Sequence, residues 1–132
     1  MLHRKTIVST KLITILKDSH QPLSVNQLIT ELRKHQLTPN KTTIYRILEK
    51  LKNNQEVIEI KTSHGTAYYE YATHQPHHDH FICNSCDVVY CLDQCHLETN
   101  KINTQALLPN KNFIVQSHEF NLHGICASCA TN

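Results

Sequence analysis

Two Cys-x-x-Cys pairs constrain this chain of 132 residues more than any other feature of its sequence. The pairs are Cys83–Cys86 and Cys126–Cys129, and they bracket the C-terminal part of the chain. In such a pair both sulfur atoms can reach the same ion from one tight turn, and zinc binds thiolates well because it is a borderline-soft metal. The sequence therefore predicts a tetrahedral zinc site around which the second half of the chain folds.

Structural disulfides are the alternative use of these cysteines, and the rest of the sequence argues against them. The N-terminus is basic and lacks the apolar segment of a secretory signal, and no run of about 18 apolar residues predicts a membrane span. We therefore expect a cytoplasmic protein, in which cysteine pairs bind metal more often than they form structural disulfides.

A run of histidines and one aspartate, His77-His78-Asp79-His80, lies just before the first cysteine pair. Imidazole and carboxylate are harder ligands than thiolate, so the sequence predicts two kinds of metal site. If the run is a strand, successive side chains point to opposite faces. His78 and His80 would then face one metal, and His77 and Asp79 another.

Charge and metal-binding residues are divided unevenly along the chain. Residues 1–71 contain 11 lysines and arginines against 6 acidic residues, whereas residues 72–132 contain 2 against 5, together with 7 of the 11 histidines and all 6 cysteines. This division indicates polyanion binding by the first half and metal binding by the second, although imbalances of this size also occur without function.

The first half has the pattern of three helices followed by a hairpin. Apolar spacing predicts helices over about 7–17, 25–34 and from Thr42 onward, with Ser24 and Gln27 as a capping box at the second. Residues 57–60 and 67–71 predict a β-hairpin. Together these elements predict a winged helix-turn-helix domain over residues 1–72, whose third helix enters the DNA major groove.

Four residues of the third helix lie off its apolar stripe and are candidates for contact with DNA. Arginine and lysine bind phosphates or guanine edges, and threonine or tyrosine can touch a thymine methyl group. An ordinary solvated helix face is the alternative, but the third helix of such a domain favours DNA contact. The candidates are Thr43, Tyr45, Arg46 and Lys50.

The second half, residues 77–132, follows a short hinge at residues 73–76. We expect strands at 81–83, 88–92 and 113–115, and a helix between the last two, within residues 97–108 and ending near Pro109. The fold class is thus α+β, with an N-terminal winged helix-turn-helix and a small C-terminal α/β domain. Such a unit buries little apolar surface and needs zinc and a second copy of itself.

The ordered set of motifs resembles the ferric uptake regulator (Fur) family of bacterial metal-responsive repressors. The resemblance implies a homodimeric repressor that binds double-stranded operator DNA and controls metal-uptake genes, without a small-molecule substrate or a membrane. The motifs that carry it are residues 24–28, 43–48 and 77–86, His118 and residues 124–129.

The resemblance also implies three ligand sets. The four cysteines of the two pairs match the structural zinc site, and a regulatory Zn(II) or Fe(II) binds elsewhere. The sensing site would consist of Glu70, His78, His80, Cys91 and His20. A second site in the dimerisation domain would consist of His77, Asp79, Glu98 and His118.

Two positions of the sensing site depart from the family pattern. Pro22 stands where many iron sensors have a histidine, so His20 would have to replace it from a shifted loop. Cys91 stands where an acidic ligand is expected, and a thiolate moves preference from Fe(II) towards Zn(II). This favours the zinc-uptake regulator (Zur) branch. Iron or peroxide sensing, and an inert buried Cys91, remain the alternatives.

Two other functional classes explain the sequence less well. A small zinc metallohydrolase would need an open coordination position and a general base, and no His-Glu-x-x-His helix or glycine-rich phosphate loop is present. A zinc-ribbon interaction module would leave Tyr45, Arg46 and the basic first half unexplained. Cys95, His74, His96 and His123 match no ligand set that we can name.

Overall fold

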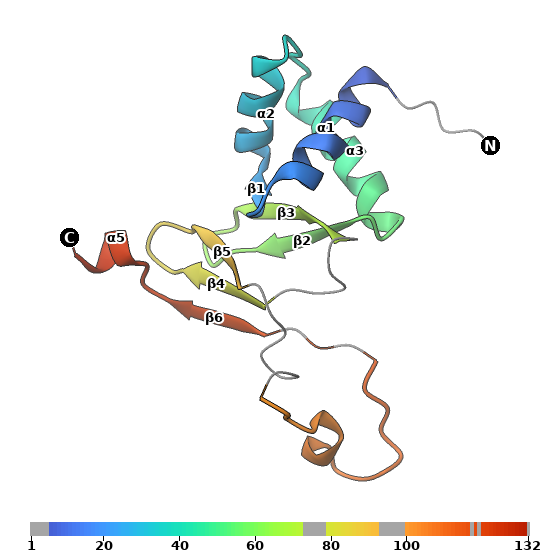
Figure 1. Cartoon of the computed structure of the whole chain (residues 1–132), viewed down its shortest axis with the longest axis vertical. Helices are drawn as coiled ribbons and strands as arrows, with labels where there is room; N and C mark the ends of the chain where they lie inside the picture. Colours follow the sequence, from blue (N-terminus) through green and yellow to red (C-terminus); the bar gives the residue numbers. More distant parts are fainter. Residues whose placement is uncertain (1–5, 73–78, 93–99, 117, 119, 132) are drawn as a thin grey trace. The chain divides into compact units, whose positions relative to one another are not determined.

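The computed structural model describes residues 6–72, 79–92, 100–116, 118 and 120–131. The chain forms two compact units, Met1–Pro76 and His77–Asn132 (Figure 1). In the part that is described, no helix combines the length and the apolar character needed to cross a membrane.

The N-terminal unit begins with three helices, α1 (Ile7–Asp18), α2 (Val25–Lys34) and α3 (Lys41–Asn53). Each begins at a polar side chain that accepts a hydrogen bond from a backbone N–H in the first turn, which is how short helices satisfy their exposed donors. The predicted capping box is present at α2, where the Ser24 and Gln27 side chains each accept a hydrogen bond from the other residue's backbone N–H.

A small antiparallel sheet completes this unit. It contains β1 (Leu23–Ser24), β2 (Val57–Lys61) and β3 (Ala67–Tyr71), in the order β1-β3-β2. The turn between β2 and β3 includes Gly65 at φ +90°, a conformation that side chains disfavour. Three helices packed on one side of a hairpin form the predicted winged helix-turn-helix (Figure 1).

The core of this unit explains which face of α3 remains accessible. Leucines of α1 and α2 pack against Ile44, Leu48 and Leu51 of α3. This apolar stripe fixes one side of α3 against the other helices, so the opposite side carries exposed polar residues. Among these are Tyr45 and Arg46, two of the predicted DNA contacts.

The C-terminal unit contains a second small sheet. Its strands are β4 (Asp79–Cys83), β5 (Val89–Leu92) and β6 (Asn121–Gly124), in the order β5-β4-β6. β4 pairs with β5 antiparallel and with β6 parallel. A short helix, α5 (Ala127–Ala130), follows β6 directly. The described chain is therefore mixed helix and sheet, as predicted.

Two expectations for this unit are wrong in detail. Residues 113–115 form no strand; Ile114 is 82% exposed, and the Phe113 carbonyl accepts a hydrogen bond from the Gln105 side chain. The third strand is β6 instead, which has little β-propensity and is held by its pairing with β4.

The helix expected within residues 97–108 lies partly outside the described residues, since 97–99 are not among them. The described remainder forms only a 3₁₀ turn, η2 (Thr104–Leu107). The side chain of Asn103 accepts a hydrogen bond from the Gln105 N–H at its start, and such local bonds compete with α-helix formation.

The first prediction tests the core that positions α3. Leu28 of α2 is fully buried, so Leu28→Ala should lower the free energy of unfolding by about 2–5 kcal/mol through lost contacts and a residual cavity. Ile7, at the start of α1, is 77% exposed, and Ile7→Ala should change it by no more than about 0.5 kcal/mol. Urea denaturation of both variants measures the difference, and similar losses in both would contradict the described core.

Candidate metal centre and nucleic-acid interface

The first cysteine pair occupies the tight turn between β4 and β5. Cys83 ends β4, and two backbone hydrogen bonds from this residue close the turn. Its carbonyl accepts from the Asp87 N–H at 3.0 Å, and its own N–H donates to the Val88 carbonyl at 3.0 Å. Asp87 adopts φ +62°, which aspartate tolerates better than most residues. The turn brings the N–H groups of Ser85 and Cys86 within 3.4 and 3.5 Å of the Cys83 Sγ.

The second pair reaches the same place because β6 runs parallel to β4. Gly124 lies opposite Cys83 in that pairing, and its carbonyl accepts a hydrogen bond of 2.7 Å from the Asn84 N–H. Cys126 then stands at the N-terminus of α5, where its N–H donates to the Cys83 Sγ at 3.4 Å. Cys129 lies one turn further along this helix.

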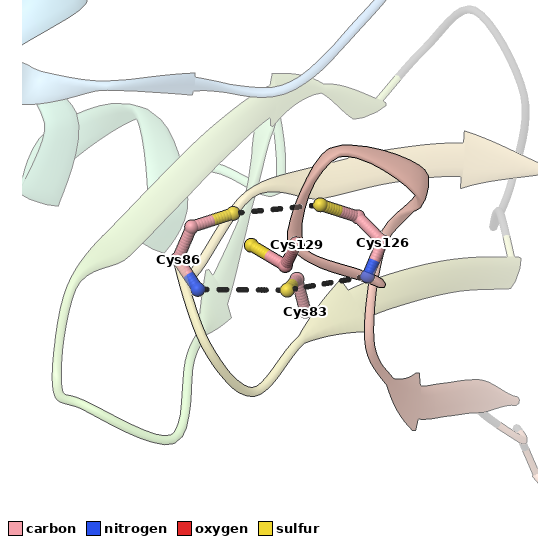
Figure 2. A group of neighbouring side chains, drawn as sticks. All are labelled: Cys83, Cys86, Cys126 and Cys129. Atoms are coloured by element: carbon pink, nitrogen blue, oxygen red, sulfur yellow. Dashed lines mark hydrogen bonds between the residues drawn. The ribbon is translucent and has the colours of Figure 1, made fainter. Parts of the chain in front are cut away.

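The four sulfur atoms converge from these two turns (Figure 2). All four Sγ atoms lie within 4.8 Å of one another, and the Cys86–Cys126 pair is 3.8 Å apart. A tetrahedral zinc ion with Zn–S bonds of about 2.3 Å needs sulfur–sulfur edges of about 3.8 Å. No disulfide joins these cysteines. The donor set and its spacing therefore fit one zinc ion.

The electrostatics of the four thiols are unequal. The N–H groups of Cys126 and Cys86 donate to the Cys83 sulfur and lower the pKa of Cys83 to about 6. A hydrogen bond with Ser85 acts to lower the pKa of Cys129, but the sulfurs of Cys126 and Cys86 outweigh it and raise that pKa to about 12. The Cys83 thiolate thus forms readily, whereas Cys86 and Cys129, whose pKa values are raised, need a cation to balance their charge, so metal binding at these two residues must displace protons.

The sequence identifies the four cysteines but not the groups that stabilise the Cys83 thiolate. The N–H donors to Cys83 come from the backbone, and no residue type marks them. The left-handed Asp87 directly after Cys86 is the one cue in the sequence, because aspartate is among the residues that accept this conformation in turns.

The second half of the histidine run forms the start of β4. Asp79 and His80 are adjacent and therefore point to opposite faces of the sheet. His80 lies opposite Cys91 of β5, and their ligand atoms are within 4.8 Å of one another. An imidazole and a thiol thus face the same side of the sheet, close enough to share an ion.

Of the other predicted ligands, the structure describes some and not others. Glu70 lies on β3 in the N-terminal unit, His20 lies in the exposed bend after α1, and His118 precedes β6. His77, His78 and Glu98 lie outside the described residues, as do His74, Cys95 and His96.

The candidate DNA contacts lie along α3 as expected from its periodicity. Tyr45, Arg46 and Lys50 are exposed, whereas Thr43 is half-buried and donates its backbone N–H to the Asn40 cap at 2.9 Å. The exposed side of the helix thus presents an aromatic ring and two cations, a combination suited to phosphates and base edges.

Comparison with known proteins accounts for almost the whole chain. The model of the ferric uptake regulator family matches residues 3–123. The ferric uptake regulation protein of Bordetella parapertussis is 24% identical over 127 residues, covering 96% of this chain and 88% of that protein. The protein of the same name from Campylobacter jejuni is 32% identical over 88 residues, covering 66% of this chain and 53% of its own length.

Solved structures share the fold. The ferric uptake regulator of Helicobacter pylori superimposes with a TM-score of 0.78 at 22% identity, over 96% of this chain and 82% of that one. The peroxide stress regulator of Campylobacter jejuni gives 0.69 at 20%, over 92% and 88%. A zinc uptake regulator of Mycobacterium tuberculosis gives 0.51 at 23%, over 92% and 91%. The fold alone thus accommodates several regulatory functions.

The second prediction tests the sulfur cage. Cys83→Ser should lose the bound zinc and unfold the C-terminal unit or disrupt the dimer, because the free energy of binding at such a site is free energy of folding. Cys91→Ser, on the neighbouring strand, should keep this zinc. Metal content after mild chelation, together with sedimentation, measures both effects. A stable zinc-containing dimer in Cys83→Ser would remove Cys83 from the site.

Proposed function

This chain belongs to the ferric uptake regulator family and is therefore a metal-responsive transcriptional regulator, and we propose that it represses metal-uptake genes by binding operator DNA as a dimer when its sensing site holds metal. Proteins of this family are transcription regulators and not enzymes, so the metallohydrolase alternative no longer applies. We further propose Zn(II), ahead of Fe(II), as the sensed metal.

The four-cysteine cage is proposed as the structural zinc site. Support comes from its sulfur spacing and from the donors that stabilise the Cys83 thiolate. A site made only of thiolates binds zinc tightly and offers no open position for a reaction. Such a site suits an ion that stays bound and stabilises the fold, and regulation needs a different set of ligands.

The sensing site is proposed to include His80 and Cys91, and their pairing across β4 and β5 is the observation that carries this function. Glu70, His78 and His20 complete the proposed set from the sequence. A thiolate beside imidazole favours zinc over a set of carboxylates. A second site of His77, Asp79, Glu98 and His118 is proposed in the dimerisation domain, where Asp79 faces away from His80.

The proposed ligands come from both units of the chain, and this suggests how metal would control DNA binding. Glu70 and His20 belong to the N-terminal unit, whereas His80 and Cys91 belong to the C-terminal unit. Ligands on both sides of a hinge would restrict the angle between the units, and so the separation of the two recognition helices in a dimer. Metal would then favour the spacing that matches the DNA half-sites, with a typical coupling of about 1–3 kcal/mol.

The third prediction tests the recognition helix. Arg46 is exposed on α3, so Arg46→Ala should weaken binding to a DNA duplex selected by the wild-type protein and reduce the salt dependence of that binding by about one phosphate contact. Zinc content should not change. Lys111→Ala, which removes an exposed cation from the C-terminal unit, is the control. Unchanged affinity and salt slope in Arg46→Ala would mean that α3 does not enter the groove.

The fourth prediction tests the choice of metal. Cys91→Asp should shift activation of DNA binding from Zn(II) towards Fe(II) or Mn(II), because a carboxylate is a harder ligand than a thiolate. Cys91→Ala should weaken activation by every metal. DNA binding titrated against buffered free Zn(II), Fe(II) and Mn(II) measures both variants beside the wild type. Normal zinc activation of Cys91→Ala, or a wild type that responds to Fe(II) alone, would limit Cys91 to a packing role.

A further inference from the structure

A chain of polar side chains joins α3 to the two long strands of the N-terminal sheet. The Tyr69 hydroxyl on β3 donates to Glu59 Oε2 on β2 at 2.9 Å. Lys52 Nζ, in the last turn of α3, donates to Glu59 Oε1 at 3.1 Å. Glu59 therefore uses both carboxylate oxygens to connect the recognition helix with the wing.

The three side chains differ in burial, which shows which end of the polar chain belongs to the core. Tyr69 is 4% exposed and belongs to the core, whereas the side chains of Glu59 and Lys52 are 16% and 43% exposed. Partial burial acts to raise the pKa of Glu59, but the hydrogen bonds from Tyr69 and Lys52 outweigh it and hold that pKa below its usual value. Glu59 is therefore a charged acceptor bound to a buried tyrosine, and Lys52 is the more exposed end of the polar chain.

Lys52 lies on the side of α3 that also carries one of the proposed DNA contacts. Tyr45, Glu49 and Lys52 follow one another at helical spacing, so they share one flank of the helix. Burial and the hydrogen bond with Glu59 raise the pKa of Tyr69, and Tyr45 and Glu49 act electrostatically in the same direction. The polar chain thus supports the flank of α3 from which Tyr45 projects.

Tyr69, at the other end of the polar chain, lies next to a proposed metal ligand. Glu70 follows Tyr69 in β3, so its side chain points to the face of the sheet opposite Tyr69 and Tyr71. Tyr69 packs in the helical core, and Lys17 of α1 lies over the Tyr71 ring with Nζ 5.1 Å from its centroid. A displacement of β3 at Glu70 would therefore reach α3 through Tyr69, Glu59 and Lys52, whereas the contact between Tyr71 and Lys17 leads to α1 and not to α3.

We propose that Glu59 is a positioning residue that transmits the state of Glu70 to the recognition helix, by holding Lys52 of α3 to Tyr69 of β3. This inference rests on the proposed role of Glu70 as a sensing ligand. It assigns Glu59, Tyr69 and Lys52 no contact with metal and requires none with DNA. Their effect is on how strongly metal binding favours DNA binding.

The half-exposed ion pair limits the size of the effect. Pairs of this exposure contribute little, at most a factor of about five in an equilibrium constant. Breaking the hydrogen bonds of the polar chain should therefore lower the metal-induced gain in DNA affinity about three- to fivefold and leave a residual response. The polar chain thus adjusts the coupling between metal binding and DNA binding and is not the sole cause of that coupling.

The experiment measures the ratio of DNA affinities with and without regulatory metal, with the four-cysteine zinc retained in both states. The probe is a duplex selected by the wild-type protein, with whichever of Zn(II), Fe(II) or Mn(II) activates it most. Lys52→Met and Tyr69→Phe should each lower this ratio, and the double variant should lower it no further, because both act through Glu59. Glu59→Gln, which keeps an acceptor for Tyr69 but loses the charge, should also lower the ratio.

Lys17→Met is the matched control, since it removes a lysine that contacts β3 from α1 and should leave the ratio unchanged. An unchanged ratio in Lys52→Met and Glu59→Gln would overturn the inference. So would an equal loss of affinity with and without metal accompanied by a shallower salt dependence, because Lys52 would then be a phosphate contact. Thermal unfolding of each variant separates these outcomes from loss of the fold.

A further variant separates failure of this inference from failure of the proposed function. Glu70→Gln should abolish most of the metal response. If it does so while the Lys52 and Glu59 variants respond normally, only the positioning role is wrong. If Glu70→Gln responds normally, the proposed sensing site is wrong and the inference falls with it.

Discussion

The convergence of four sulfur atoms at the end of β4 is the constraint on which the C-terminal unit depends. Among its described residues, the buried apolar positions are Ile82, Cys83, Val89 and Cys126, so two of the four belong to the proposed zinc site. The N-terminal unit, in contrast, buries ten residues of a continuous cluster. A unit with so little core needs another source of stability, and a bound structural ion supplies folding free energy directly.

The same contrast explains which parts of the fold the sequence could predict. The helices and hairpin of the N-terminal unit follow from local rules: apolar spacing, the Ser24–Gln27 capping box and the turn at Gly65. β6 follows no local rule, because residues 121–124 form a strand only through parallel pairing with β4. The β-prone residues 113–115 lack such a partner among the described strands, and they were predicted wrongly for this reason.

For the proposed metal centres, the sequence identifies side chains that the structure brings together, but not the backbone groups that stabilise the Cys83 thiolate. Spacing alone predicts the four cysteines, and strand alternation places Asp79 and His80 on opposite faces of β4. Spacing cannot reveal that three backbone N–H groups point at the Cys83 sulfur, because that depends on how two distant turns meet. Nor can it give the register that sets His80 opposite Cys91, which follows from the turn between β4 and β5.

β4 also carries residues of both kinds of proposed metal site. Cys83, at its end, is held by the turn and by β6, and this fixes the register in which His80 pairs with Cys91. An ion that maintains this register must stay bound while the concentration of the sensed metal changes, so the two roles need ligand sets of different affinity. Four thiolates and a mixed thiolate–imidazole set provide that difference. Loss of metal response in a variant of the cage would therefore reflect the position of His80, and sensing is to be tested at His80 and Cys91 themselves.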